Sequence, residues 1–170
     1  NLTIDAGTAV KSGTIGGIIG HCGVDPKKTS THAVYTTEKC VNLGTLTSSG
    51  NYVGGMIGYV WGSNDENTWT YAVIKNCVNL GTLVGTKNAA PATEPDTTFL
   101  RATYLSQFVG YVNASNTVID NSYGLGKLEN TNDDYNVIFG LSSDVALKYK
   151  VDNIYLAPND GTKNYSYGHD

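Results

Sequence analysis

An eight-residue segment that recurs at a fixed spacing constrains the fold of this chain more than any other feature. Residues 39–46 are Lys-Cys-Val-Asn-Leu-Gly-Thr-Leu, and residues 76–83, which begin 37 positions later, repeat seven of these eight residues. Weaker copies of the segment begin at Asn121 and Asn153. Self-similarity at a period of this size indicates an architecture in which each repeat stacks on the next.

A second motif combines apolar residues with glycines and follows the first motif along the chain. Residues 53–60 are Val-Gly-Gly-Met-Ile-Gly-Tyr-Val, and related segments occur at residues 15–20, 105–112 and 137–141. These segments are short, rich in β-branched and aromatic residues, and bounded by Gly and Asn, without a helical period. The chain therefore alternates two kinds of strand separated by turns.

Stacking such strands about 4.8 Å apart would bury the apolar side that a single coil leaves exposed. It would pair Ile57 with Val109 and Leu46 with Leu83. We expect the repeated glycines to supply corners with positive φ and close backbone approach, and stacked Asn residues such as Asn42 to bond along the ladder. The sequence thus predicts an all-β fold, a parallel β-helix (β-solenoid) of about four to five irregular coils with loop insertions.

The predicted boundaries follow the phase of the motifs. We expect one domain over residues 1–170, with coils that begin near residues 2, 39, 76, 121 and 153. The first of these rests on an alignment of residues 5–8 with residues 42–45 that needs a one-residue gap. Two insertion loops are expected at residues 62–70 and 85–103; the second contains two prolines, which cannot donate to a central ladder.

The two motifs together resemble the GLUG-type repeats of large bacterial and protist surface proteins and adhesins. The resemblance is strongest over residues 39–83 and weakens where Ser122 replaces Cys and where Ser106 and Gln107 replace the paired glycines. It implies an extracellular, secreted or cell-surface location and an architectural role, because such a family is defined by a repeat. It implies no catalytic signature.

Composition narrows the class of partner. Only 15% of the residues are charged and the formal net charge is −4, which gives no electrostatic footprint for nucleic acid or an anionic membrane surface. Apolar runs are too short for a membrane-spanning helix, so no membrane span is expected.

Three cysteines are too few for a disulfide framework. Cys40 and Cys77 should be stacked neighbours, at a Cα separation that a disulfide can bridge, but parallel in-register Cβ atoms point the same way and fit its torsion poorly. We therefore expect two buried thiols rather than a disulfide. Cys22 aligns with Val60 and Val112, and the same interpretation applies to it.

Strict alternation that turns Cys40, Asn42 and Leu46 inward would expose an apolar stripe and create an interaction face. The alternative is that the Asn-Leu-Gly corner resets the alternation and buries the Leu ladder. The candidate stripe consists of Val41, Leu43, Val78, Leu80, Tyr123 and Leu125.

Two further sets of residues are candidate sites. Asn-x-Ser/Thr sequons at Asn1, Asn113 and Asn164 are candidate glycosylation sites, although about this number arises by chance. Aromatic residues that flank the insertions could stack on sugar rings or simply pack the loop bases onto the solenoid. These loop aromatics are Trp61, Trp69, Tyr71, Phe99 and Tyr104.

The sequence predicts no enzyme, no cofactor and no metal site. Arg101 is the single Arg, the three His residues share no metal-like spacing, and the paired acids at residues 65–66 and 133–134 favour solvated turns.

The leading hypothesis is a non-enzymatic structural or adhesive module of an extracellular or cell-surface assembly. Neither end shows a polar cap, which predicts that neighbouring domains or further copies cover the coil ends, with head-to-tail stacking into a filament as a specific possibility. The alternative is a carbohydrate-binding or carbohydrate-processing β-helix that uses its insertion loops. Glycans or a host or cell-surface ligand are the other partners considered.

Overall fold

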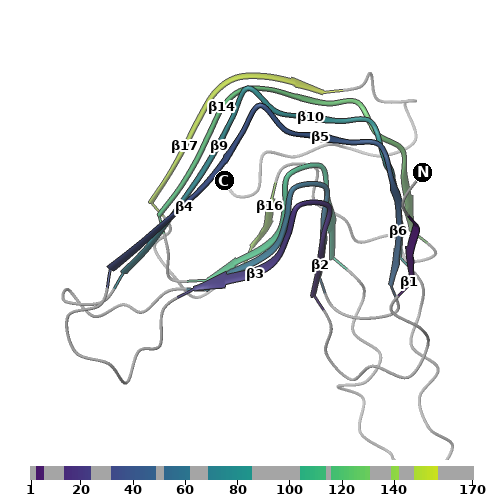
Figure 1. The fold of residues 1–170 in the computed structure, drawn as a ribbon, viewed down its shortest axis with the longest axis horizontal. Helices are drawn as coiled ribbons and strands as arrows, with labels where there is room; N and C mark the ends of the chain where they lie inside the picture. The colour runs from purple at the N-terminus through teal and green to yellow at the C-terminus, as the bar shows by residue number, and fades with distance from the viewer. Residues whose placement is uncertain are drawn as a thin grey trace, which may run out of the picture.

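The computed structural model describes residues 3–5, 14–23, 32–48, 52–61, 69–85, 104–113, 116–130, 139–141 and 148–156. Within these ranges every regular element is a β-strand (Figure 1), and the strands pair in parallel. The four sheets stack about four coils, so the predicted all-β parallel solenoid is confirmed.

The strands form four sheets. The outer sheet has six strands: β4 (His32–Glu38), β9 (Trp69–Lys75), β14 (Asn116–Gly124), β10 (Val78–Asn79) and β5 (Val41–Asn42) in order, with β17 (Lys148–Leu156) beside β14. The side sheet is β1 (Thr3–Asp5), β6 (Thr45–Ser48), β11 (Thr82–Gly85) and β15 (Leu128–Asn130). The short inner sheet is β12 (Tyr104–Ser106), β7 (Tyr52–Gly54) and β2 (Thr14–Gly16). The long inner sheet is β16 (Phe139–Leu141), β13 (Val109–Asn113), β8 (Ile57–Trp61) and β3 (Ile19–Gly23).

The described strands follow the sheets in one order along the chain: outer, side, short inner, long inner. In Figure 1 the outer sheet slopes upward, bends at a corner and crosses the top before the chain descends into the side sheet. The two inner sheets meet beneath this arch as an inverted V. The coils β4–β8 and β9–β13 each contain five strands, because each contributes two strands to the outer sheet and one to each of the other three sheets.

The strand registers match the sequence repeat over most of the chain. Leu83 pairs with Leu46 and Val109 pairs with Ile57, as the motifs predict. Asp120 pairs with Asp152 and Tyr123 with Tyr155, so the weak copy in the last strand is in phase. The sequence-level alignment of these positions is confirmed.

The predicted phase of residues 5–8 is wrong. Asp5 pairs with Thr47 and Ile4 pairs with Leu46, so these residues lie opposite the end of the first motif rather than opposite Asn42. The physical reason is that this register puts the large apolar Ile4 in the column of Leu46 and Leu83, whereas the gapped alignment would put the small Ala9 there.

The bounds of the insertions are also corrected. Strand β9 already begins at Trp69, so Trp69 and Thr70 belong to a strand rather than to the insertion at residues 62–70. Gly85 likewise ends strand β11. Residues 62–68 and 86–103, which make up the rest of the insertions, lie outside the described residues.

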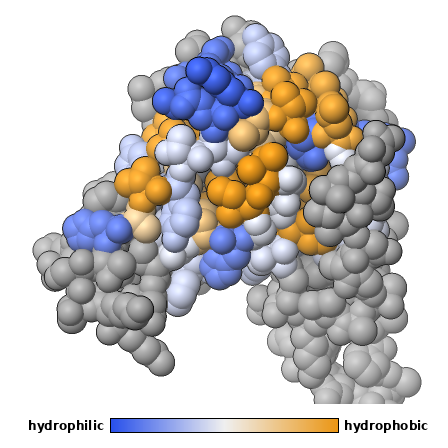
Figure 2. Space-filling view, viewed as in Figure 1, coloured by the Kyte–Doolittle hydropathy of each residue, from blue (hydrophilic) through white to orange (hydrophobic). Residues whose placement is uncertain are grey.

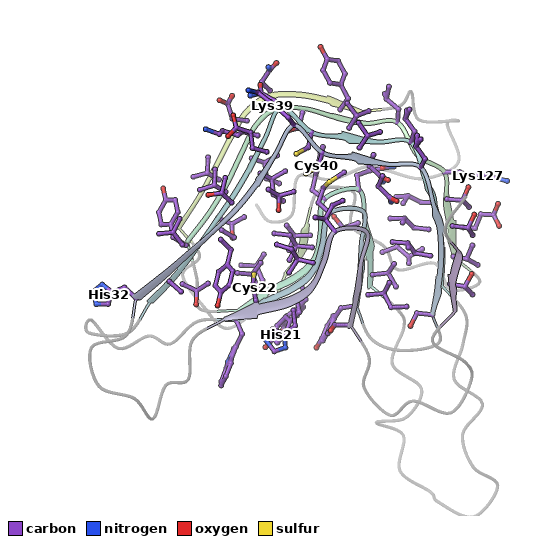
Figure 3. The ribbon with its side chains drawn as sticks, in the orientation of Figure 1. His21, Cys22, His32, Lys39, Cys40 and Lys127 are labelled. Atoms are coloured by element: carbon purple, nitrogen blue, oxygen red, sulfur yellow. The ribbon has the colours of Figure 1, made fainter. Side chains whose placement is uncertain are left out.

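Two apolar clusters fill the space between the layers. The larger lies between the outer sheet and the long inner sheet, and the smaller lies between the side sheet and the short inner sheet (Figure 3). The buried residues of the larger cluster are Cys22, Met56, Ile57, Val60, Ala72, Ile74, Cys77, Phe108, Val109, Val112 and Ile119. Those of the smaller cluster are Ile15, Leu46, Val53, Leu83 and Leu105.

The prediction that glycines supply the positive-φ corners is wrong for the described coils. The non-glycine residues with positive φ are Lys39, Asn76 and Asn121, at the corner of the outer sheet, whereas the glycines of the second motif do not have positive φ. The motif glycines instead permit close approach: a Cβ on Gly54 would overlap the carbonyl oxygen of Ile57, and one on Gly55 would overlap the backbone of the next coil. Because these two glycines have no Cβ, the backbones can approach closely at the apex of the inverted V.

Candidate functional site

The predicted stripe lies on the outside of the top of the outer sheet. Val41 and Leu43 are 52% and 64% exposed, Leu80 is 49% exposed, and Tyr123 and Leu125 are 39% and 44% exposed. Val78 is half-buried between its neighbours. In Figure 2 hydrophobic residues gather along the upper edge, next to the hydrophilic corner.

The backbone holds the stripe together coil by coil. The amide of Leu80 donates to the carbonyl oxygen of Asn42 at 2.9 Å, and the amide of Leu125 donates to that of Asn79 at 2.8 Å. Alternation continues unbroken through the corner, because Asn42, Leu46 and the intervening Gly44 all face inward. The alternative in which the corner resets the alternation therefore does not occur.

An amide ladder beneath the stripe satisfies the polar groups that this alternation buries. The Asn42 Nδ2 donates to the Asn79 Oδ1 at 2.9 Å, and the Asn79 Nδ2 donates to the Gln107 Oε1 at 2.6 Å. The Gln107 Nε2 then donates to the carbonyl oxygen of Gly126 at 2.7 Å. Each Asn also accepts from the backbone amide two residues later, that of Gly44 or Gly81. The ladder thus ties the top of the outer sheet to the apex of the inner sheets.

Gln107 is a structural residue that sequence reasoning missed. It stands where the preceding coil has Gly55, and the sequence suggests only that the glycine pair is lost there. In the structure its side chain, only 3% exposed, ends the amide ladder. The signal in the sequence is a long amide side chain at a position that must face two stacked Asn residues.

A column of small polar side chains lies at the corner beside the stripe. The Cys40 Sγ donates to the Glu38 carbonyl oxygen at 3.3 Å, the Cys77 Sγ to that of Lys75 at 3.2 Å, and the Ser122 Oγ to that of Asp120 at 2.8 Å. Cysteine and serine therefore make the same local bond in successive coils. This explains why Ser122 can replace cysteine in the third coil.

The three cysteines are free thiols, so no disulfide joins Cys40 and Cys77. Cys22 and Cys77 are buried, whereas Cys40 is only partly buried. Burial raises the pKa of the Cys22 thiol to about 12 and also raises the pKa of the Cys77 thiol. Both groups are therefore protonated at neutral pH and pack as small apolar side chains.

Charged side chains of alternating sign occupy the outer edge of the corner. Glu38, Lys75 and Asp120 are register partners in three successive coils. The Lys75 Nζ lies 3.4 Å from the Glu38 Oε2. Opposite charges therefore meet at the two steps between these three coils, whereas the register partner of Asp120 in the next coil is Asp152, which carries the same charge.

A cluster of aromatic rings lies on the faces of the inner sheets that point away from the core. His21, Tyr59 and Tyr111 are register partners in three coils of the long inner sheet. Ring centroids are 4.8 Å apart for His21 and Tyr59 and 5.4 Å apart for Tyr59 and Tyr111. Tyr52 of the short inner sheet stacks on Tyr111 at 4.3 Å and on Tyr59 at 5.4 Å. We call these residues, with Trp61, the aromatic cluster.

Trp61 joins this cluster through an edge contact with His21, with centroids 6.4 Å apart. Figure 3 shows His21 projecting from the underside of β3 while Cys22 points to the opposite side, into the core. Partial desolvation of the imidazole lowers the pKa of His21. The cluster is therefore an uncharged aromatic surface at neutral pH.

The predicted loop aromatics do not form one group. Trp61 ends β8 on the long inner sheet, whereas Trp69 and Tyr71 lie in β9 of the outer sheet. Tyr104 begins β12, beside Tyr52. Phe99 lies outside the described residues, as do the side chains of Trp69 and Tyr104. Of the five, Trp61 is the residue that the structure brings into a described aromatic cluster.

Of the three candidate glycosylation sites, only the backbone of Asn113 lies within the described residues. Asn113 is the last residue of β13 and pairs with Trp61 of the preceding coil. Its side chain lies outside the described residues, as do Asn1 and Asn164 entirely. Use of these sequons stays a prediction.

Within the described ranges, no three His, Cys, Asp or Glu side chains are grouped so that they could hold a metal ion. No helix in that part of the chain is long and apolar enough to cross a membrane. The paired acids at residues 65–66 and 133–134 lie outside it.

Comparison with known proteins gives no match to any family model, to any curated protein or to any solved structure.

Proposed function

We propose that this chain is a non-enzymatic structural or adhesive module of an extracellular or cell-surface assembly. The exposed apolar stripe is the observation that carries the proposal. It runs over three consecutive coils on one face, with Leu43, Leu80 and Leu125 in one column. A contiguous apolar surface of this kind on a soluble protein marks an interaction face.

The support beneath the stripe suits a role in assembly. Backbone hydrogen bonds and the buried amide ladder of Asn42, Asn79 and Gln107 fix the stripe from below. A backbone held in this way needs no ordering when a partner covers the stripe, which lowers the cost of association. The partner proposed is another copy of the chain or a neighbouring domain of the same assembly.

End-to-end stacking of copies is a second form that the assembly can take. Parallel ladders are extended by adding one more strand in register, and all four sheets are parallel. A contact of this kind that does not close gives a filament.

Sedimentation velocity over a range of concentrations tests the stripe. The test variant carries Leu43→Ser, Leu80→Ser and Leu125→Ser. The matched control is Val34→Ser, because Val34 is 60% exposed on the slope of the outer sheet and outside the stripe. We expect the natural chain and the control to associate with rising concentration and the triple variant to stay monomeric.

A natural chain that stays monomeric at every concentration would count against self-association. Association that is equal in the natural chain and the triple variant would remove the stripe from the proposal. Fibres of the triple variant in negative-stain images would show instead that copies join end to end.

A further inference from the structure

The aromatic cluster combines ring faces with hydrogen-bonding groups. His21, Tyr59 and Tyr111 stand in one column across three coils, and Tyr52 closes over the last two from the short inner sheet. Each phenol carries a hydroxyl that donates and accepts hydrogen bonds, and the imidazole does both through its two nitrogens. The surface is therefore amphipathic at every ring.

The described part of the surface around the cluster carries no charged side chain. The described outward-facing side chains of the two inner sheets are Thr14, His21, Tyr52, Tyr59, Trp61 and Tyr111. None of them is Asp, Glu, Lys or Arg. The outer corner differs, because Glu38, Lys39 and Lys75 are gathered there. A charged ligand would find no opposite charge among the described residues of the cluster.

The rings are also ordered before any ligand arrives. Tyr52 stacks on Tyr111 with centroids 4.3 Å apart, and Tyr59 lies 5.4 Å from both. Mutual packing restricts the side-chain torsions, so a ligand that covers the exposed parts of the rings pays little ordering entropy.

From these observations we propose that the aromatic cluster binds a neutral carbohydrate chain that runs across successive coils. A sugar ring presents an apolar face of C–H groups that packs on aromatic surface, and a rim of hydroxyls that hydrogen-bond to phenol and imidazole groups. The column of His21, Tyr59 and Tyr111 provides one aromatic ring with a hydrogen-bonding group in each of three coils. Single-stranded nucleic acid also stacks on aromatics but requires a positively charged groove, and the described outward-facing residues of the inner sheets include no Lys or Arg.

This site is separate from the stripe, which lies on the outer sheet. Titration calorimetry on the full chain provides the test. The probes are neutral hexasaccharides of glucose, mannose and N-acetylglucosamine, with an anionic uronic-acid hexasaccharide for comparison. The variants are His21→Ala, Tyr59→Ala and Tyr111→Ala, and the matched control is Tyr123→Ala, which removes an exposed tyrosine from the stripe.

We expect one or more neutral hexasaccharides to bind, each cluster variant to weaken binding about tenfold or more, and Tyr123→Ala to leave it unchanged. His21 is exposed, so His21→Ala keeps the test valid if a tyrosine variant fails to fold. The proposal is overturned if no neutral hexasaccharide binds, if binding is equal in His21→Ala and the natural chain, or if the anionic hexasaccharide binds more tightly than the neutral ones.

Discussion

Three non-glycine residues hold a left-handed backbone conformation at the corner of the outer sheet. The φ angles are 55° at Lys39, 55° at Asn76 and 44° at Asn121. Asn tolerates this region because its short side chain bonds locally, and here the Asn121 Nδ2 donates to the Asn76 Oδ1 at 2.6 Å. Lys39 has neither a short side chain nor a hydrogen bond of this kind. Its ion pair with Glu38, at 4.0 Å, is too exposed to offset the backbone strain.

Lys39→Asn should therefore stabilise the fold. The substitution relieves backbone strain and allows the amide column to extend to a third coil. We expect the free energy of unfolding, measured by urea denaturation, to rise by about 1 kcal/mol. Lys127→Asn is the control, because Lys127 is exposed and has no positive φ. A gain of equal size in both variants would refute the explanation from backbone strain.

The buried thiol of Cys22 makes stability depend on pH in the alkaline range. Its pKa is about 12 in the folded chain, above the ordinary value of 9.0. The unfolded chain therefore loses this proton first, so the stabilising contribution is complete below about pH 9 and is lost as the pH rises towards 12.

We expect the urea midpoint to fall between pH 8 and pH 10.5, and to fall less in Cys22→Val. Valine fits, because Val60 and Val112 occupy the same column in later coils. Equal falls in the natural chain and in Cys22→Val would contradict the role assigned to this thiol.

At the scale of the elements, the glycines of the second motif act by allowing strands to approach one another. A Cβ on Gly58 would lie 2.5 Å from the Gly20 carbonyl oxygen and 2.7 Å from backbone atoms of Ile15. The equivalent Gly20 differs, because the nearest described atom to its Cβ position is the Thr14 carbonyl oxygen at 3.8 Å. The same motif glycine is thus required in one coil and not in the coil before it.

Gly58→Ala should destabilise the fold by about 2 kcal/mol or more, since backbone atoms cannot move aside cheaply. Gly20→Ala should leave stability within about 0.5 kcal/mol. Thermal unfolding followed by circular dichroism measures both. Equal losses in the two variants would mean that the close approach of the coils is not what selects glycine.

The amide ladder is the second device that joins elements. Asn79 bonds to Asn42, to Gln107 and to the Gly81 amide, so Asn79→Leu would leave several buried polar groups unpaired. We expect a loss of about 3 kcal/mol in the free energy of unfolding. Thr36→Leu, which introduces the same side chain at an exposed position of β4, should cost much less. A small loss for Asn79→Leu would show that water replaces the ladder.

At the scale of the whole molecule, the repeat made most of the architecture predictable. Seven identical residues at a spacing of 37 force Leu46 over Leu83, and the second motif likewise forces Ile57 to stack with Val109. Alternation then predicts the outward residues of the stripe. The alignment of the weak first copy matched Asp5 to Asn42, whereas the observed pairing is set by Ile4, which lies opposite Leu46.

The arrangement of the sheets was not predictable from the repeat. Neither motif predicts that the inner sheets form an inverted V. This arrangement depends on the close backbone approach at Gly54 and Gly55. The aromatic cluster was missed for this reason, because Tyr52 and Tyr59 come together only across the V. Gln107 was missed because its partners lie in other sheets.

The central claim is that successive coils stack in register, so that Leu43, Leu80 and Leu125 form one exposed column. Spin labels at Leu43→Cys and Leu80→Cys test it by electron paramagnetic resonance, in a chain with Cys22 replaced by valine and Cys40 and Cys77 replaced by serine. Neighbouring strands lie about 4.8 Å apart, so we predict strong spin–spin broadening in the doubly labelled chain and none in either single mutant. A doubly labelled spectrum equal to the sum of the two single spectra would contradict the stacked column.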